Sequence, residues 1–347
     1  MVSHTAIESE GCVLKHIKLR LKRYRPLVAC YRLLKSGAIV SDWWYTRFSK
    51  HRKAVLTPSG FKLVSRNYAA NRAMQSGTFE VEETEIIRHH LKSAEVFVDV
   101  GANIGLYTCM ARSEGKYAIA IEPQPQNLEC LYAGLSLNGW SDTEVYPLGL
   151  GEKYGVVTLY GASGTGASLL SGWATYSSRF QQTIPLTTLD TLLSNRFDGK
   201  KLLIKIDVEG AEYGVLKGAG RTLKMLPRPT WMIEICLNEF HPAGLNPNYL
   251  ETFEMFWSHG YEIRTADHEN RLITPMDVRD WIAAKRSSLS GFNYVFTPAG
   301  EDFSNMRTQK DIEAMFQEDC QSTNSPRIDK TGIATVAIEP PGIQDVR

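Results

Sequence analysis

The chain has 347 residues and a formal net charge of +1, with 43% apolar and 22% charged residues. This length is enough for one large core plus an appended segment, and the composition is that of an ordinary globular protein. Residues 1–53 hold 12 Lys/Arg against 3 Asp/Glu, whereas the remainder holds 27 against 35. Because the body is acidic, it is not expected to grip nucleic acid by neutralising phosphates.

Cysteine spacing and hydropathy exclude two further classes of protein. The cysteines lie at positions 12, 30, 109, 130, 236 and 320, without a C-x-x-C pair or a Cys/His cluster. We therefore expect no structural zinc and a reducing compartment, the cytoplasm, with Cys109 and Cys130 as small buried thiols. No stretch approaches eighteen uncharged apolar residues, so no membrane span is predicted. The apolar run 26–31 is too short for a signal peptide, and Arg32 interrupts it.

Residues 1–59 are predicted to form a basic N-terminal leader. Apolar positions recur at spacings of three and four between residues 13 and 35, as on one face of a helix, beside a stripe of Lys and Arg. Two interpretations stay open. The helix packs its apolar face on the body, or residues 13–45, with their aromatic side chains, lie peripherally on the anionic inner face of a membrane.

Residues 60–302 alternate strand and helix, the pattern of a parallel α/β sheet. Two late strands are expected to close one edge, which makes seven in all, with helices on both faces. Residues 161–172 are rich in Gly and Ser and predict a loop over the site. The segment 303–347 is polar and without periodicity, so we expect a disordered tail. The predicted core strands are 96–100, 117–122, 143–148, 202–206, 230–236, 261–265 and 292–296, and the helices are 82–92, 104–113, 125–138, 211–217 and 247–258.

The segment 96–105 predicts a buried strand, a glycine turn and a helix N-terminus. Gly101 and Gly105 would let the backbone turn sharply and approach a ligand closely. The spacing differs from a dinucleotide fingerprint, because its third and sixth positions are occupied by Asn103 and Leu106. Asp99 at the strand end would repel a diphosphate but suit a cation. S-adenosylmethionine carries an ammonium and a sulfonium and no phosphate, so a methyl-donor site is expected.

A second acid supports this interpretation. The strand 117–121 ends in Glu122-Pro123, about twenty residues after the first glycine, where an acidic side chain can accept hydrogen bonds from both ribose hydroxyls. The segment 202–212 repeats the strand, turn and helix pattern with Asp207, Glu209, Gly210 and Glu212. Ligands of open parallel sheets bind beyond the carboxyl ends of the strands, so Asp207 and Glu209 should face the same crevice as Asp99. Glu212 could equally serve as an ordinary acid in the first turn of a helix.

With these motifs together, the chain resembles the FkbM family of S-adenosylmethionine-dependent methyltransferases. The matching stretches follow the family's order over roughly residues 60–300: Ser76-Gly-Thr-Phe-Glu80, Val98-Asp-Val-Gly-Ala-Asn-Ile-Gly105, Ile121-Glu-Pro123, Lys205-Ile-Asp-Val-Glu-Gly-Ala-Glu212 and Trp231-Met-Ile-Glu234.

The resemblance implies a class I, Rossmann-like methyltransferase sheet with a final antiparallel strand pair. It implies O-methylation of a sugar, glycan, glycolipid or secondary metabolite, with S-adenosylmethionine as methyl donor. Carried over by position, Asp99, Gly101, Asn103 and Gly105 would line the methionine end and Glu122 would hold the ribose. The full set expected to bind the donor is Glu80, Asp99, Gly101, Ala102, Asn103, Gly105, Glu122 and Pro123.

Methyl transfer to a hydroxyl needs in-line alignment and benefits from a base that takes the proton. Three candidates remain open as the catalytic base: Asp207, Glu209 and His241. A divalent metal held by Asp207, Glu209 and Glu234 is chemically conceivable, but the same acids can act by hydrogen bonding alone, so no metal is expected.

Two other functions are alternatives for this sequence. A nucleic-acid base methyltransferase usually carries an Asn/Asp-Pro-Pro-aromatic turn after the fourth strand, where the flipped base stacks. The chain has Asp207-Val-Glu-Gly there, with neither proline nor aromatic residue. The second alternative is a non-catalytic module attached to a glycan-synthesis complex. Such a module would have no need of both Asp99 and Glu122.

Overall fold

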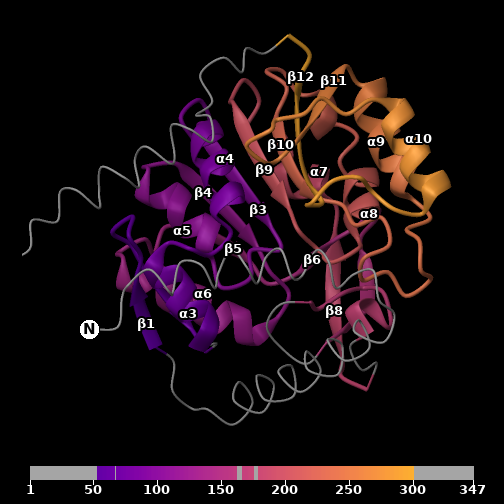
Figure 1. Cartoon of the computed structure of the whole chain (residues 1–347). Helices are drawn as coiled ribbons and strands as arrows, with labels where there is room; N and C mark the ends of the chain where they lie inside the picture. Colours follow the sequence, from indigo (N-terminus) through magenta and orange to yellow (C-terminus); the bar gives the residue numbers. More distant parts are fainter. Residues whose placement is uncertain (1–52, 67, 162–165, 176–178, 301–347) are drawn as a thin grey trace, which may run out of the picture. The chain divides into compact units, whose positions relative to one another are not determined.

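A seven-stranded sheet forms the core of the chain (Figure 1). The computed structural model describes residues 53–300 except 67, 162–165 and 176–178. The strand order is β11-β12-β10-β9-β3-β4-β5. These strands are β3 (Val96–Val100), β4 (Tyr117–Ile121), β5 (Glu144–Tyr146), β9 (Leu202–Ile206), β10 (Thr230–Glu234), β11 (Tyr261–Thr265) and β12 (Asn293–Pro298).

Most of this sheet is parallel. β4 pairs in parallel with β5 and β3, β3 with β9, and β9 with β10, whereas β12 runs antiparallel between β10 and β11. The predicted mostly parallel seven-stranded sheet with a final antiparallel pair is confirmed. Each predicted core element agrees with the structure to within two residues at either end.

Helices connect the strands, as expected for parallel pairing. The N-terminal helices α4 and α5 pack on each other, and α5 also contacts β3 and β4. On the C-terminal side, α8 contacts α9, and α9 contacts β11 and α10. The helices are α3 (Tyr68–Ser76), α4 (Val81–Leu91), α5 (Leu106–Ser113), α6 (Pro125–Leu137), α7 (Leu189–Leu193), α8 (Glu212–Lys217), α9 (Tyr249–Ser258) and α10 (Pro275–Ala284), with short 3₁₀ turns η1 (Trp173–Thr175) and η2 (Thr222–Lys224).

The two faces of the sheet are chemically different. Val96, Val98 and Val100 belong to one large apolar core, which also holds the buried side chains of α7, α8 and α9. Because side chains alternate along a strand, Phe97 and Asp99 face the other way. All five residues of β3 are buried, as expected for a central parallel strand covered on both sides.

Two smaller β elements lie outside the seven-stranded sheet, and of their strands the sequence predicts only a short one at Phe61–Val64, which corresponds to β2. The strands β1 (Lys53–Leu56) and β2 (Lys62–Ser65) form an antiparallel hairpin, and β1 lies inside the segment expected to be a leader. The second element is a three-stranded sheet of order β6-β8-β7, built from β6 (Gly149–Leu150), β7 (Gly155–Tyr160) and β8 (Gln181–Thr187).

Several sequence expectations fall on residues that the structure does not describe. The proposed amphipathic helix and membrane contact at residues 13–45 lie outside the described part, as do the polar tail at 303–347 and positions 162–165 of the glycine-rich loop. Across the described residues, no helix combines the length and hydropathy that crossing a membrane requires. The predicted burial of Cys109 and Cys130 as small thiols outside any disulfide is confirmed.

Candidate functional site

The turn between β3 and α5 packs closely against residues that are distant in the sequence. Gly101 has φ of +84°, and a Cβ atom there would lie 1.9 Å from the carbonyl oxygen of Asp207. A Cβ atom at Gly105 would lie 2.2 Å from Leu131 Cδ1. These glycines were expected to allow a sharp turn and close approach to a ligand. The positive φ values fit the turn, and the structure adds a further reason, since protein atoms occupy the space that a side chain would need.

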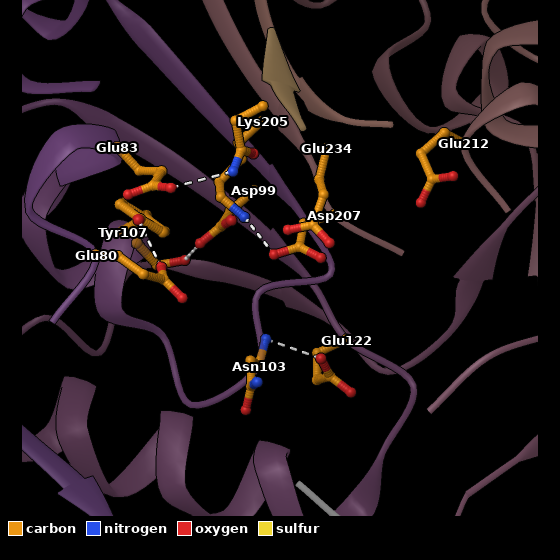
Figure 2. Close-up of polar contacts among 12 residues, drawn as sticks. Glu80, Glu83, Asp99, Asn103, Tyr107, Glu122, Lys205, Asp207, Glu212 and Glu234 are labelled. Atoms are coloured by element: carbon orange, nitrogen blue, oxygen red, sulfur yellow. Dashed lines mark hydrogen bonds and ion pairs between the residues drawn. The ribbon is translucent and has the colours of Figure 1, made fainter. Parts of the chain in front are cut away.

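Glu122 lies just after β4 and accepts a hydrogen bond from the backbone of this turn (Figure 2). Its Oε2 accepts a hydrogen bond from the Asn103 N–H at 2.8 Å, and its Oε1 accepts one from the Gln124 N–H at 2.8 Å. The Asn103 backbone is left-handed, with φ of +51°. Burial raises the pKa of Glu122 to about 7, while the backbone hydrogen bonds oppose that rise. Glu122, Pro123 and the turn residues Gly101 to Asn103 thus lie together at the carboxyl ends of β3 and β4.

Asp99 lies next to a buried cation that the sequence analysis did not assign. β3 and β9 pair so that Asp99 is the Cα partner of Lys205, and both side chains face away from the apolar core. Asp99 is 1% exposed and Lys205 is 5% exposed. Asp99 Oδ2 accepts a hydrogen bond from Thr108 Oγ1 at 2.5 Å, while its Oδ1 is buried without a hydrogen-bond partner.

Lys205 is surrounded by acidic and aromatic groups. Its Nζ lies 2.8 Å from Asp207 Oδ2 and 4.9 Å from the centre of the Tyr107 ring. Burial works against the charge of Lys205, but Asp207, Asp99 and Glu80 together raise its pKa above the ordinary value. The ammonium is therefore held charged inside the protein by three carboxyl groups.

Glu80, the residue immediately before α4, extends its side chain toward Lys205 and Tyr107. Its backbone is left-handed, with φ of +45°, and its Oε2 accepts a hydrogen bond from the Tyr107 hydroxyl at 2.7 Å. Burial raises the pKa of Glu80, and Lys205 opposes the rise. Figure 2 shows Glu80, Tyr107, Asp99 and Lys205 on neighbouring elements with their side chains gathered together.

The remaining acids bring more carboxyl groups to the site than the ammonium of Lys205 can pair with. Glu234, at the end of β10, has a pKa raised well above its ordinary value by burial and then by Asp207 and Glu209. Figure 2 shows its carboxyl close to that of Asp207, whereas Glu212 is set apart. Glu212 Oε1 accepts the Gly210 N–H at 2.9 Å, as an acid at a helix N-terminus does. An excess of buried carboxyl groups suits a cationic ligand.

The three predicted base candidates have different surroundings. Asp207 is paired with Lys205, as described above. Glu209 Oε2 accepts a hydrogen bond from the indole Nε1–H of Trp173 at 2.6 Å, and burial followed by Asp207 raises the pKa of Glu209 to about 7. His241 Nδ1 accepts the Ala243 N–H at 3.2 Å, and burial lowers the pKa of His241. The rings of His241 and Trp173 meet edge to face at 6.0 Å. Trp173 therefore links two of the three candidates.

Sequence reasoning missed Lys205, Tyr107 and Trp173. A signal existed for Lys205, because a charged residue interrupts the apolar run 202–206 of a buried strand. Tyr107 lies in an otherwise ordinary apolar helix, and Trp173 lies beyond a glycine-rich loop, so neither carries a local signal. Over the described part of the chain, no group of three or more His, Cys, Asp or Glu side chains is arranged to hold a metal ion.

The strand order and the helices between the strands are those of a Rossmann-like methyltransferase fold. Comparison with known families goes further, because the methyltransferase FkbM domain matches residues 99–263. Over these residues the chain is similar to the FkbM methyltransferase family, as the motifs predicted.

Two known proteins show the extent of the similarity. The hexuronic acid methyltransferase AglP of Haloferax volcanii is 29% identical over 170 residues, which cover 48% of this chain and 64% of that protein. Among solved structures, the precorrin-6y C5,15-methyltransferase of Geobacter metallireducens is 12% identical. That match covers 53% of this chain and 72% of the other, with a TM-score of 0.30.

Proposed function

We propose that the protein transfers a methyl group from S-adenosylmethionine to an oxygen atom of a sugar-containing acceptor. The observation that carries the proposal is the set of buried carboxyl groups at the carboxyl ends of β3, β4, β9 and β10 around Lys205. S-adenosylmethionine carries a sulfonium and an ammonium, and both are favoured by an excess of carboxyl groups.

The residues present fit this donor. Asp99 Oδ1 is buried without a hydrogen-bond partner, which leaves acceptor capacity next to the turn. Each oxygen of Glu122 accepts one backbone N–H, and the Asn127 side chain donates to the same carboxyl. A carboxylate has about four acceptor positions, so one remains for a ribose hydroxyl. Glu80, Asp99, Gly101, Ala102, Asn103, Gly105, Glu122 and Pro123 remain the residues proposed to bind the donor.

When bound, the donor would supply a methyl group made electrophilic by the adjacent sulfonium. The protein's tasks are to align the acceptor oxygen with that methyl group and to accept the proton of a hydroxyl acceptor. Asp207, Glu209 and His241 are the groups proposed for the proton. A carboxylate acceptor would need no such base, since it is already ionised at neutral pH.

The proposed acceptor class rests on the family and on the relative that acts on a hexuronic acid. A hexuronic acid offers both hydroxyl and carboxylate oxygens, and our proposal is a hydroxyl. Labelled S-adenosylmethionine should transfer its methyl group to methyl β-D-glucuronide, with mass spectrometry of the product identifying an ether. Transfer to RNA or DNA but not to any sugar probe would contradict the proposal and favour the base-methyltransferase alternative.

Donor binding is tested at Glu122. Glu122→Gln keeps the shape of the side chain but removes a charged acceptor, and a hydrogen bond to a charged group contributes about 1.5–3 kcal/mol. Isothermal titration should therefore show S-adenosylmethionine binding about 10- to 100-fold more weakly. Glu129→Gln is the control, because Glu129 lies on α6 and pairs with Arg66. An unchanged dissociation constant would remove Glu122 from the donor site, and no binding heat in the wild type would contradict the function itself.

A further inference from the structure

Three residues between β7 and β8 donate hydrogen bonds to Glu209. The indole Nε1–H of Trp173 donates to Glu209 Oε2 at 2.6 Å, and Ser168 Oγ donates to the Glu209 carbonyl oxygen at 2.6 Å. The backbone N–H of Gly166 also donates to the Glu209 carboxyl. The loop itself is anchored, because Ser168 pairs with Tyr160 at the end of β7 through two backbone hydrogen bonds of 2.8 and 2.9 Å.

Trp173 is fixed on several sides. It is 2% exposed, and its ring lies so close to Gly210 that a Cβ atom there would be 2.4 Å from a ring carbon. Its ring also contacts Phe240, with centroids 6.1 Å apart, and the neighbouring Ala174 N–H donates to the Phe240 carbonyl oxygen at 2.9 Å. These contacts fix the orientation of the indole N–H toward Glu209, which lies on the turn after β9.

Asp207 and His241, the other two candidates for the catalytic base, have different partners. Asp207 is engaged in an ion pair, with its Oδ2 2.8 Å from the Lys205 ammonium. His241 uses Nδ1 to accept the N–H of Ala243 and meets Trp173 edge to face. Glu209, by contrast, is held by neutral N–H donors that fix its position while leaving it able to take a proton.

We infer that Trp173 is a positioning residue that orients Glu209 as the proton acceptor for the methyl-accepting hydroxyl. This inference rests on the proposed function. In the step, the hydroxyl oxygen forms a bond to the methyl carbon, and the carbon–sulfur bond breaks with its electron pair passing to sulfur. The hydroxyl proton passes to the Glu209 carboxylate, so the sulfonium donor leaves as a neutral thioether.

The groups facing Glu209 come from every element packed against it. They are Asp207 and Glu212 on its own turn, Lys205 on β9, Glu234 at the end of β10 with Cys236 after it, and His241 across Trp173. Burial and Asp207 raise the pKa of Glu209 to about 7, and the donors Trp173 and Gly166 lower it. Removing the indole N–H should therefore raise that pKa further.

The contact can be tested without an acceptor, in the full chain labelled with ¹⁵N-tryptophan. The indole resonance that disappears in Trp173→Phe should move with pH in the wild type, with a midpoint near 7. In Glu209→Gln the same resonance should not move between pH 5.5 and 8.5. Trp281→Phe is the matched control, because Trp281 is also a buried tryptophan whose Nε1–H donates to a side chain, Ser288 Oγ, at 3.1 Å. A Trp173 indole chemical shift that does not change with pH in the wild type would overturn the inference.

The role in the reaction is tested with methyl β-D-glucuronide as acceptor. Trp173→Phe keeps an aromatic ring over Gly210, and the acidic limb of its kcat/KM profile should move up by about one pH unit, a loss of roughly 10-fold below the midpoint. Its dissociation constant for S-adenosylmethionine should not change, and Trp281→Phe should keep the wild-type profile. Glu209→Gln should lose ether formation at least about 100-fold, the range of a general base.

Other outcomes separate the inference from the proposed function. An unchanged profile in Trp173→Phe, or full ether formation by Glu209→Gln, would overturn the inference while leaving methyl transfer intact. A wild-type product that is a methyl ester, formed equally well by Glu209→Gln, would do the same. Absence of donor binding in the wild type would instead contradict the proposed function, and the indole titration would then decide whether Trp173 holds Glu209.

Discussion

A buried lysine among acids sets the charge of the site at the scale of single residues. Leaving a charge unpaired in a protein interior is costly, so Lys205 and its carboxyl neighbours depend on one another. Asp207 is the partner at 2.8 Å, and Asp99 and Glu80 act on the same ammonium. Lys205 therefore lets several carboxyl groups lie close together, and a cationic ligand would favour the ionised forms of those that Lys205 does not pair with.

At the same scale, Gly101→Ala is expected to be severely destabilising. The new methyl group would overlap the Asp207 carbonyl oxygen, at 1.9 Å, in a backbone conformation with φ of +84°. We expect a loss of about 3 kcal/mol or more in the free energy of unfolding. Gly115→Ala is the matched control, because Gly115 has φ of +73° and no atom within 4 Å of an added Cβ, so only about 1–2 kcal/mol should be lost. Urea denaturation of both variants measures the difference, and equal losses would contradict the steric argument.

The sequence was informative about residues at strand ends and less so about their partners. Asp99, Glu122, Asp207 and Glu209 could be placed because carboxyl ends of parallel strands meet at one edge of the sheet. The pairing of Asp99 with Lys205 depends on which strands are neighbours and in what register, and a single strand's pattern does not contain that information.

At the scale of elements, one asparagine binds the N-terminal hairpin to α6. Asn138, just after α6, accepts the Lys62 N–H on Oδ1 at 2.8 Å and donates from Nδ2 to the Lys62 carbonyl oxygen at 2.7 Å. Its side-chain amide thus binds both backbone groups of one residue of β2. The same Nδ2 donates to the Gly134 carbonyl oxygen at 2.8 Å, which fixes the amide to the helix.

Asn138→Ala should loosen this hairpin selectively. Two hydrogen bonds to β2 would be lost, each worth about 0.5–1.5 kcal/mol. Hydrogen exchange followed by mass spectrometry should show faster exchange in peptides covering residues 53–65 and unchanged exchange in those covering β9. The exposed Asn195→Ala serves as the control. Equal acceleration across the whole chain would mean that Asn138 contributes to global stability instead.

The core elements were predictable, and the smaller sheets were not, for a physical reason. β3 and β9 are buried along their whole length and so appear as continuous apolar runs. β7 and β8 are largely exposed or half-buried. β8 also contains Pro185, and proline argues against a strand because it has no N–H to donate to a neighbouring strand. Without continuous apolarity or clean alternation, these strands resemble loops.

At the scale of the whole molecule, carboxyl groups with raised pKa link stability to pH. Burial raises the pKa of Glu122, Glu209 and Glu212 to about 7 from the ordinary value of 4.5. The folded protein therefore binds more protons than the unfolded chain between these values, so its stability falls as pH rises through this window. Burial lowers the pKa of His90 to about 4 from 6.5, so between these values the unfolded chain binds more protons and His90 makes the stability rise with pH.

The free energy of unfolding should therefore increase as pH is lowered from 8 to about 6.5. The slope approaches about 1.4 kcal/mol per pH unit for each carboxyl group that titrates only in the folded state. Below pH 6.5 the unfolded chain protonates its histidines, and the increase should slow or reverse. Urea denaturation at half-unit intervals of pH, followed by tryptophan fluorescence, measures the curve. A stability that rises steadily from pH 6.5 to 8 would contradict the raised pKa values.

The contact between Gly101 and the carbonyl of residue 207 has a consequence for protein engineering. The segment proposed to cradle the methyl donor and the segment proposed to serve the acceptor touch backbone to backbone, without a side chain to absorb a mismatch. A chimera that imports the first turn from a relative should fail to fold unless it also imports residues 207–210. Grafts intended to change acceptor preference should therefore exchange both turns as one unit.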